Sequence, residues 1–126
     1  EDDTSGTARI GAAMTESSGI FSFPATGIWR ITSTVAWFGV ISGMTYGSLY
    51  NYSTIDDGTW VFRGYGSDGI DSTKRWGTVT STMMLDVADI SLCKVKFVAY
   101  GPNANTISGD TTYNQTYFEF YKLGDT

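Results

Sequence analysis

The segment from Ile28 to Phe38 alternates apolar and polar side chains with a period of two, the period of a β-strand with one buried face. Its buried row would consist of Trp29, Ile31, Ser33, Val35 and Trp37. Shorter strand-like segments are separated by glycine-containing turns, and they lie at 20–23, 49–52, 60–63, 79–87, 92–100 and 113–123. No segment keeps the 3.6-residue period of a helix over more than two turns. The sequence therefore predicts an all-β domain.

One connection between these segments carries a specific turn signal. Asp56-Asp57-Gly58 separates two short apolar runs, and Asp-Gly in that position favours a β-hairpin. Glycine adopts positive φ at no steric cost, so we expect Gly58 to supply the reversal.

The chain of 126 residues has the size of one domain, with residues 1–7 as a flexible N-terminal segment and residues 8–126 as the folded unit. Aromatic residues make up 15% of the chain and charged residues only 17%, which favours strands and argues against disorder. The net charge of −5 and the scattered Lys and Arg argue against nucleic-acid binding. No apolar run approaches the roughly 20 residues of a membrane span, so we expect no membrane insertion.

The residue types needed for several kinds of catalysis are missing. The chain has no histidine, which excludes Ser-His-Asp and Cys-His catalytic arrangements and imidazole zinc sites. Glu16 and Glu119 fall on separate predicted strands, so a glycosidase-type carboxylate pair is not expected. Cys93 falls on an apolar strand face and is expected to be a buried small hydrophobe. We therefore expect a protein that is not an enzyme and needs no cofactor.

Three segments in the same order resemble one known family. The block from Gly19 to Trp29 resembles the G-x-F-x-x-P-x-x-G-x-Y block of the complement component 1q-like globular domain. The segment from Leu85 to Phe97 is similar to a later strand pair of that family, with Ala88-Asp89 in place of Gly-Asp. The segment from Thr116 to Tyr121 resembles the closing strand, with Glu119 where glycine is usual.

This resemblance implies a ten-stranded jelly-roll β-sandwich of the tumour necrosis factor type that assembles as a homotrimer. Carried over to this chain, it implies a subunit interface with Trp29, Tyr113, Tyr117 and Tyr121. The residues support a partner independently. Aromatic side chains lie on both faces of the last predicted strand, and one domain cannot bury both faces.

A narrower resemblance points to a biological setting. The amino-acid sequence of residues 16–29 is similar to that of C-terminal domains on structural or tail fibre proteins of tailed bacteriophages, particularly marine ones. The resemblance implies a domain on the virion that trimerises and presents loops for recognition of the host surface. The alternative is a secreted or cell-surface module of cellular origin that binds a glycan or a protein.

Aromatic and polar residues near the predicted loops are candidates for such recognition. Rings can stack on sugars, and polar neighbours can bind hydroxyl groups. The candidate ligand-binding residues are Tyr50, Tyr52, Trp60, Tyr65, Asp68, Arg75 and Trp76.

Acidic groups in the predicted loops have two interpretations. Asp56 and Asp57 are candidate calcium ligands, because carboxylate oxygens suit that ion. The interpretation that we favour is that these residues, like Asp68, Asp86 and Asp89, shape turns through side-chain hydrogen bonds. On that interpretation the chain holds no metal.

Overall fold

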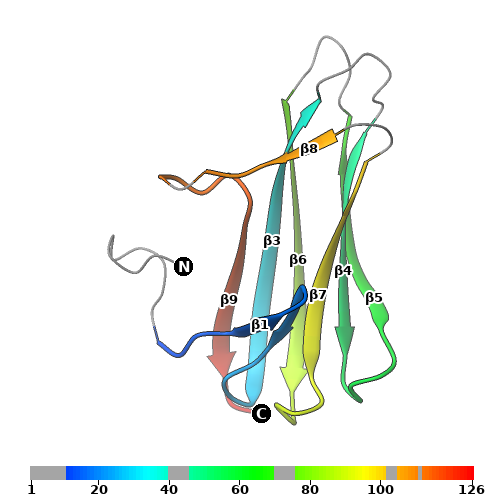
Figure 1. The fold of residues 1–126 in the computed structure, drawn as a ribbon. Coiled ribbons are helices and arrows are strands. Elements are labelled where there is room, and N and C mark those ends of the chain that lie inside the picture. Colours follow the sequence, from blue (N-terminus) through cyan, green and yellow to red (C-terminus); the bar gives the residue numbers. More distant parts are fainter. Residues whose placement is uncertain (1–10, 40–45, 70–75, 102–104, 111) are drawn as a thin grey trace.

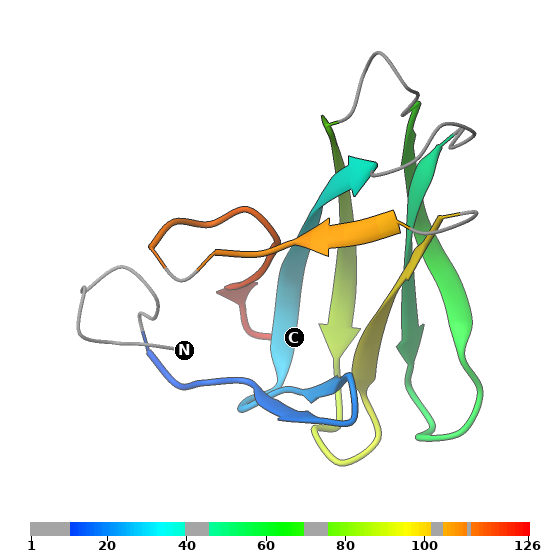
Figure 2. The same ribbon diagram turned by 45° about the horizontal axis from the view of Figure 1, so that its top comes forward.

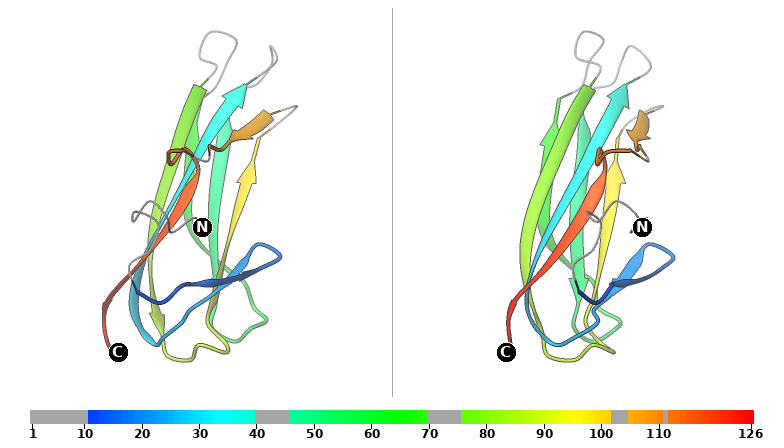
Figure 3. Two further views of the ribbon diagram at one scale, coloured as in Figure 1. Left: turned by 60° about the vertical axis from the view of Figure 1, so that its left-hand side comes forward. Right: turned by 90° about the vertical axis from the view of Figure 1, so that its left-hand side faces the viewer.

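The computed structural model describes residues 11–39, 46–69, 76–101, 105–110 and 112–126. The N-terminal segment 1–7 and Arg75 lie outside these ranges. All regular structure within them is β-strand, arranged in two antiparallel sheets that form the two layers of a sandwich (Figures 1 and 3). The prediction of an all-β protein is confirmed.

One sheet has five strands in the order β1-β2-β7-β4-β5. These are β1 (Thr15–Ser17), β2 (Ile20–Ser22), β7 (Lys94–Tyr100), β4 (Gly47–Thr54) and β5 (Val61–Asp68).

The other sheet is built around one long central strand. Its members are β3 (Gly27–Gly39), β6 (Trp76–Val87), β8 (Asn105–Ser108) and β9 (Tyr117–Gly124). β6 pairs with β3 along one side, while β9 and β8 share the other side of β3, one after the other (Figure 2).

The antiparallel pairs are nested along the sequence. The β4·β5 hairpin lies between the paired strands β3 and β6, and that pair lies between the paired strands β2 and β7. β4 and β5 belong to one sheet, while β3 and β6 belong to the other. The chain therefore crosses between the layers, and the core contains residues that are distant in sequence.

The core fills the space between the sheets and has two apolar clusters. The lower cluster, toward the Gly27 end of β3, contains Phe23, Trp29, Ile31, Met83, Leu85, Val87, Cys93 and Val95. The upper cluster contains Val35, Trp37, Leu49 and Val79. The inward face predicted for β3 is confirmed, including the buried Ser33. Cys93 is buried and free, as expected of a small hydrophobe.

Two local predictions were wrong. The last strand begins at Tyr117, so Tyr113 lies in the irregular segment before it. In the β4–β5 turn, Asp57 adopts positive φ, at 56°, whereas Gly58 does not. Asp tolerates this conformation better than most residues, and hydrogen bonds around the turn hold it.

Candidate binding faces

Aromatic side chains gather on the outward side of the five-stranded sheet. We define the aromatic face by Tyr50, Tyr52, Trp60, Phe62 and Tyr65 together with Lys96. Tyr50 lies opposite Tyr65 and Tyr52 opposite Phe62, with ring centroids 5.1 Å and 5.8 Å apart. Such cross-strand aromatic pairs stabilise a sheet and fix the orientation of its rings. Phe62 and Tyr65 remain 52% exposed each.

A β-bulge places Phe62 and Tyr65 on the same face. In a regular strand, residues three apart point to opposite sides. Here the register shifts, because Asn51 pairs with Gly64 while Tyr52 pairs with Phe62, and Arg63 has no opposite residue. The extra residue on β5 reverses the alternation, so both rings point outward.

Glycines on the inward side of β5 allow this strand to lie close to β6. A Cβ on Gly66 would lie 2.5 Å from Cγ1 of Val79, and one on Gly64 would lie 2.7 Å from Oγ of Ser81. The bulky side chains of β5 therefore lie outside the sandwich, where they build the aromatic face.

Lys96 is the cation of this face. Its Nζ lies 4.2 Å from the centroid of the Trp60 ring and 5.6 Å from that of Tyr52, distances at which an ammonium is attracted to a ring. Lys94 pairs with Asp57 and Lys122 with Asp125, whereas within the described residues no carboxylate pairs with Lys96.

Hydroxyl groups border the rings at the upper end of the aromatic face. The Tyr65 hydroxyl lies 3.3 Å from the Ser48 hydroxyl, which donates to Ser67 at 3.2 Å. Hydrogen bonding by Ser48, and then by Ser67, lowers the pKa of Tyr65. Tyr46 and Tyr100 lie near this end with ring centroids 6.3 Å apart. Partial burial, with the neighbouring tyrosines, raises the pKa of Tyr46.

The structure brings together only part of the predicted ligand site. Tyr50, Tyr52 and Tyr65 lie on strands and Trp60 directly precedes one, so these candidates lie on the face of a sheet and not on loops. Asp68 is the last residue of β5. Trp76 begins β6 in the other sheet and packs on Phe38, with centroids 4.6 Å apart.

Sequence reasoning missed Phe62 and Lys96. Phe62 could have been found by pairing the two arms of the predicted hairpin, which places it near Tyr52. The position of Lys96 depends on the pairing of β4 with β7, where Lys96 lies opposite Tyr52. The sequence pattern of neither strand alone indicates that β4 and β7 pair.

The outward side of β3, β6 and β9 has a different character, and we call it the threonine face. Hydroxyl oxygens of opposite threonines lie within hydrogen-bonding distance, at 3.3 Å for Thr32 with Thr82 and 3.1 Å for Thr34 with Thr80. The Arg30 guanidinium lies over the ring of Tyr121, 5.1 Å from its centroid. Tyr121 is 49% exposed. The described acidic groups of this face include Asp86 and Glu119.

The predicted interface residues are divided by the structure. Tyr117 and Tyr121 point outward from β9, opposite Thr34 and Arg30. Trp29 is only 6% exposed, packs on Phe23 and donates its indole N–H to the Ala25 carbonyl, so its side chain is not available to a second subunit. Tyr113 is exposed but lies off the strand.

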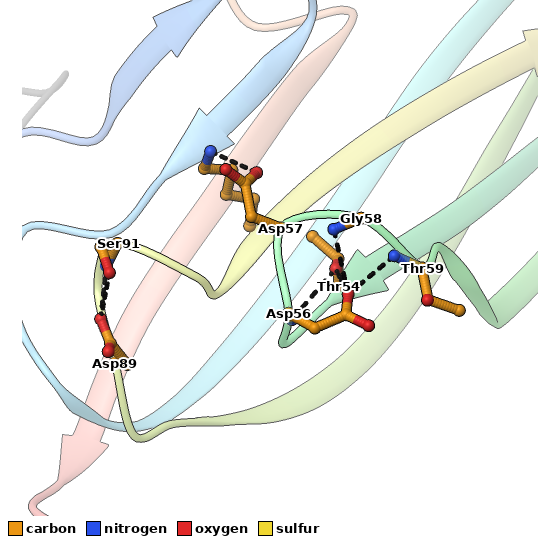
Figure 4. Close-up of polar contacts among 8 residues, drawn as sticks. Thr54, Asp56, Asp57, Gly58, Thr59, Asp89 and Ser91 are labelled. Atoms are coloured by element: carbon orange, nitrogen blue, oxygen red, sulfur yellow. Dashed lines mark hydrogen bonds and ion pairs between the residues drawn. The ribbon is translucent and has the colours of Figure 1, made fainter.

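The acidic turns hold their carboxylates in local hydrogen bonds (Figure 4). The Oδ1 atom of Asp56 accepts from the Thr54 hydroxyl at 2.7 Å and from the backbone N–H groups of Gly58 and Thr59 at 3.0 and 2.7 Å. The bond from Thr54, followed by those from Thr59 and Gly58, lowers the pKa of Asp56 well below its usual range. The predicted turn-shaping role of Asp56 is confirmed.

A second acidic turn follows the same rule. Oδ1 of Asp89 accepts from the N–H and the hydroxyl of Ser91 at 2.8 and 2.6 Å, which lowers the pKa of Asp89 (Figure 4). Asp57 pairs with Lys94 across the turns. Within the described residues, no three His, Cys, Asp or Glu side chains cluster in a way that could hold a metal ion.

The two glutamates considered for hydrolysis are not brought together. Glu16 lies on β1 of the five-stranded sheet, where it accepts the Gly19 N–H at 2.6 Å, and Glu119 lies on β9 of the other sheet. The part of the chain that the structure describes contains no helix long and apolar enough to cross a membrane.

Comparison with models of protein families gives no match, and comparison with curated proteins gives none either.

Proposed function

We propose that this chain is a non-enzymatic binding domain of a tailed-phage particle, which assembles as a homotrimer and presents its aromatic face to the surface of the host cell. The observation that carries the binding role is the gathering of exposed rings on one side of the five-stranded sheet. Exposed apolar patches on folded domains commonly mark interaction sites. The phage setting rests on the resemblance stated from the sequence.

The strand connectivity supports the jelly-roll part of this proposal. In a jelly roll, nested antiparallel pairs are wrapped so that successive pairs alternate between two sheets. The nesting of β4·β5 within β3·β6 within β2·β7 follows that scheme.

The threonine face supports the trimeric part. Tyr121 is about half exposed beside Arg30, and Tyr117 lies half-buried on the same face of β9, with Glu119 between them. Hydroxyls and rings pack well against another subunit, so this side supports a subunit contact in which Arg30, Asp86 and Glu119 would pair across the contact or remain at its solvated rim.

Light scattering after size-exclusion chromatography tests the assembly. We expect a mass three times that of the 13.7-kDa chain. Tyr121→Glu places a carboxylate in the proposed contact and should give monomer, whereas Ile55→Glu, the same charge change in the exposed β4–β5 turn, should leave the trimer intact. A wild-type monomer at micromolar concentration would contradict the proposal.

Competition for adsorption tests the recognition role. Purified domain in excess should slow the adsorption of the phage that carries it, because both occupy the same host groups. Phe62→Ala should compete less well. If excess wild-type domain leaves adsorption unchanged, the recognition role is wrong even when the protein is a trimer.

A further inference from the structure

We propose that the aromatic face binds an anionic glycan, with sugar rings stacked on Phe62 and Tyr65 and a sugar carboxylate paired with Lys96. This inference rests on the proposed recognition role and deepens it by naming the ligand class. It stands on the geometry of the rings, the charge of the surrounding strands and the state of Lys96.

The rings suit a saccharide. A pyranose presents a flat array of C–H groups to a ring and hydroxyls at its rim. Phe62 and Tyr65 offer two half-exposed rings on adjacent outward positions of β5, each held by a partner ring on β4. Rigid aromatic side chains lose little conformational entropy on binding. The hydroxyls of Tyr65, Ser48 and Ser67 lie beside them as hydrogen-bonding groups.

The charge distribution favours a ligand that carries negative charge. The chain has a net charge of −5, yet β4 and β7 contain no Asp or Glu, and the only one on β5 is Asp68, its last residue. Lys96 lies in the middle of this acid-poor surface. The nearby Asp57 of the β4–β5 turn pairs with Lys94, so an anionic ligand on the aromatic face meets in Lys96 a cation that no described carboxylate neutralises.

The state of Lys96 leaves it able to bind an anion. Two rings position its ammonium, and within the described residues no carboxylate neutralises it, unlike Lys94 and Lys122. A cation–π contact leaves the N–H donors on the side away from the ring free for an acceptor. A sugar carboxylate stacked near Tyr52 or Trp60 would reach this group.

Other occupants fit the surface less well. A single-stranded nucleic acid would also stack on the rings, but each nucleotide carries a phosphate and the aromatic face offers one cation in an acidic protein. A second copy of this chain would bring another net charge of −5 and would have to bury Lys96. Both are outcomes of the test.

The experiment measures affinity for matched probes by calorimetry with the purified wild-type protein. The probes are a six-residue oligogalacturonate, the same oligosaccharide with its carboxyls reduced to alcohols, and a sialylated oligosaccharide. The first and third carry the carboxylate on different sugars and distinguish the two sources. We expect an acidic probe to bind about fivefold tighter than its neutral counterpart, the size expected of one exposed ion pair. That preference should shrink as salt is raised.

Two variants separate the parts of the site. Lys96→Gln should abolish the preference for the acidic probe and leave affinity for the neutral one unchanged, whereas Lys122→Gln, an equal charge change on the other sheet, should keep the preference. Phe62→Ala should weaken binding of both probes about tenfold, because stacking does not depend on the carboxylate. Thermal unfolding and mass measured for each variant show that fold and assembly are retained.

Several results would overturn the inference. They are equal wild-type binding of acidic and neutral probes, a preference that survives Lys96→Gln, binding of neither acidic sugar, or binding of an oligonucleotide in their place. A loss of trimer mass in Phe62→Ala would assign the aromatic face to a subunit contact. A trimer that blocks adsorption but binds no acidic sugar would leave the proposed function standing and defeat this inference alone.

Discussion

The two apolar clusters of the core differ in extent and in what closes them. Aromatic rings connect the two sheets at the lower cluster. The ring centroids of Phe118 and Phe97 are 4.3 Å apart in a stacked arrangement, and those of Phe120 and Phe21 are 5.4 Å apart. The upper cluster is smaller, and of these rings Phe97 packs against it as well as against the lower cluster. A polar layer separates them, in which the Ser33 hydroxyl donates to Oδ1 of Asn51 at 2.8 Å. The comparison shows that one sandwich is held by two unequal apolar units with a hydrogen-bonded spacer.

The largest expected effect tests whether the clusters are unequal. Ile31 and Leu49 are both fully buried, one in each cluster. Ile31→Ala should cost about 4 kcal/mol of unfolding free energy and Leu49→Ala about 2.5 kcal/mol, because the smaller cluster can relax around the cavity more easily. Urea unfolding measures both. Equal losses would show that the two clusters act as one core.

The next effect tests the tight contact beside the upper cluster. Gly66→Ala would bring a methyl group against Val79 and should cost about 2 kcal/mol by overpacking. In a Val79→Ala background the same change should cost less than about 1 kcal/mol, because the colliding methyl is gone. A double-mutant cycle by urea unfolding gives the coupling. Additive losses would mean that Gly66 is needed for another reason.

A smaller effect tests the polar layer. Ser33→Ala removes the donor to the buried Asn51 oxygen and should cost about 1.5 kcal/mol. Adding Asn51→Leu should recover at least half of that loss, because both partners are then apolar and the amide nitrogen, which has no hydrogen-bond partner among the described residues, is removed as well. If the double variant is less stable than Ser33→Ala, the polar side chain of Asn51 itself adds to the free energy of unfolding, and the layer does not act only as a spacer.

The smallest effect concerns the turns that close the lower end. The lowered pKa of Asp56 means that its carboxylate adds stability above the unfolded pKa of about 3.9, and this contribution is lost as the pH falls through the folded pKa. Asp56→Asn keeps an acceptor oxygen but does not titrate. Unfolding midpoints between pH 7 and pH 2 should therefore fall less steeply in this variant. Parallel curves for the two proteins would contradict the turn role.

The prediction of the candidate site failed where the site depends on pairing between strands. Tyr50 and Tyr52 were recognised as candidates from local composition, but Tyr65 shares the face of Phe62 only because Arg63 is bulged out of the β4·β5 ladder. Trp76 was grouped with them because of its residue type, and the fold places it on the other sheet. The position of a bulge and the sheet to which a strand belongs depend on which strands pair. The amino-acid sequence of one segment alone gives little indication of either.

The sequence by itself determined which rows of side chains are buried. The inward rows of β3 and β6, from Trp29 to Trp37 and from Val79 to Val87, follow from period-two alternation, since successive side chains of a strand point to opposite faces. Only the tertiary structure decided what lies opposite those rows and outside them. It placed Phe23 against Trp29, Ser33 against Asn51, and Lys96 over Trp60. The reason is that side-chain alternation is set by local backbone geometry, whereas partners across a sandwich are set by long-range register.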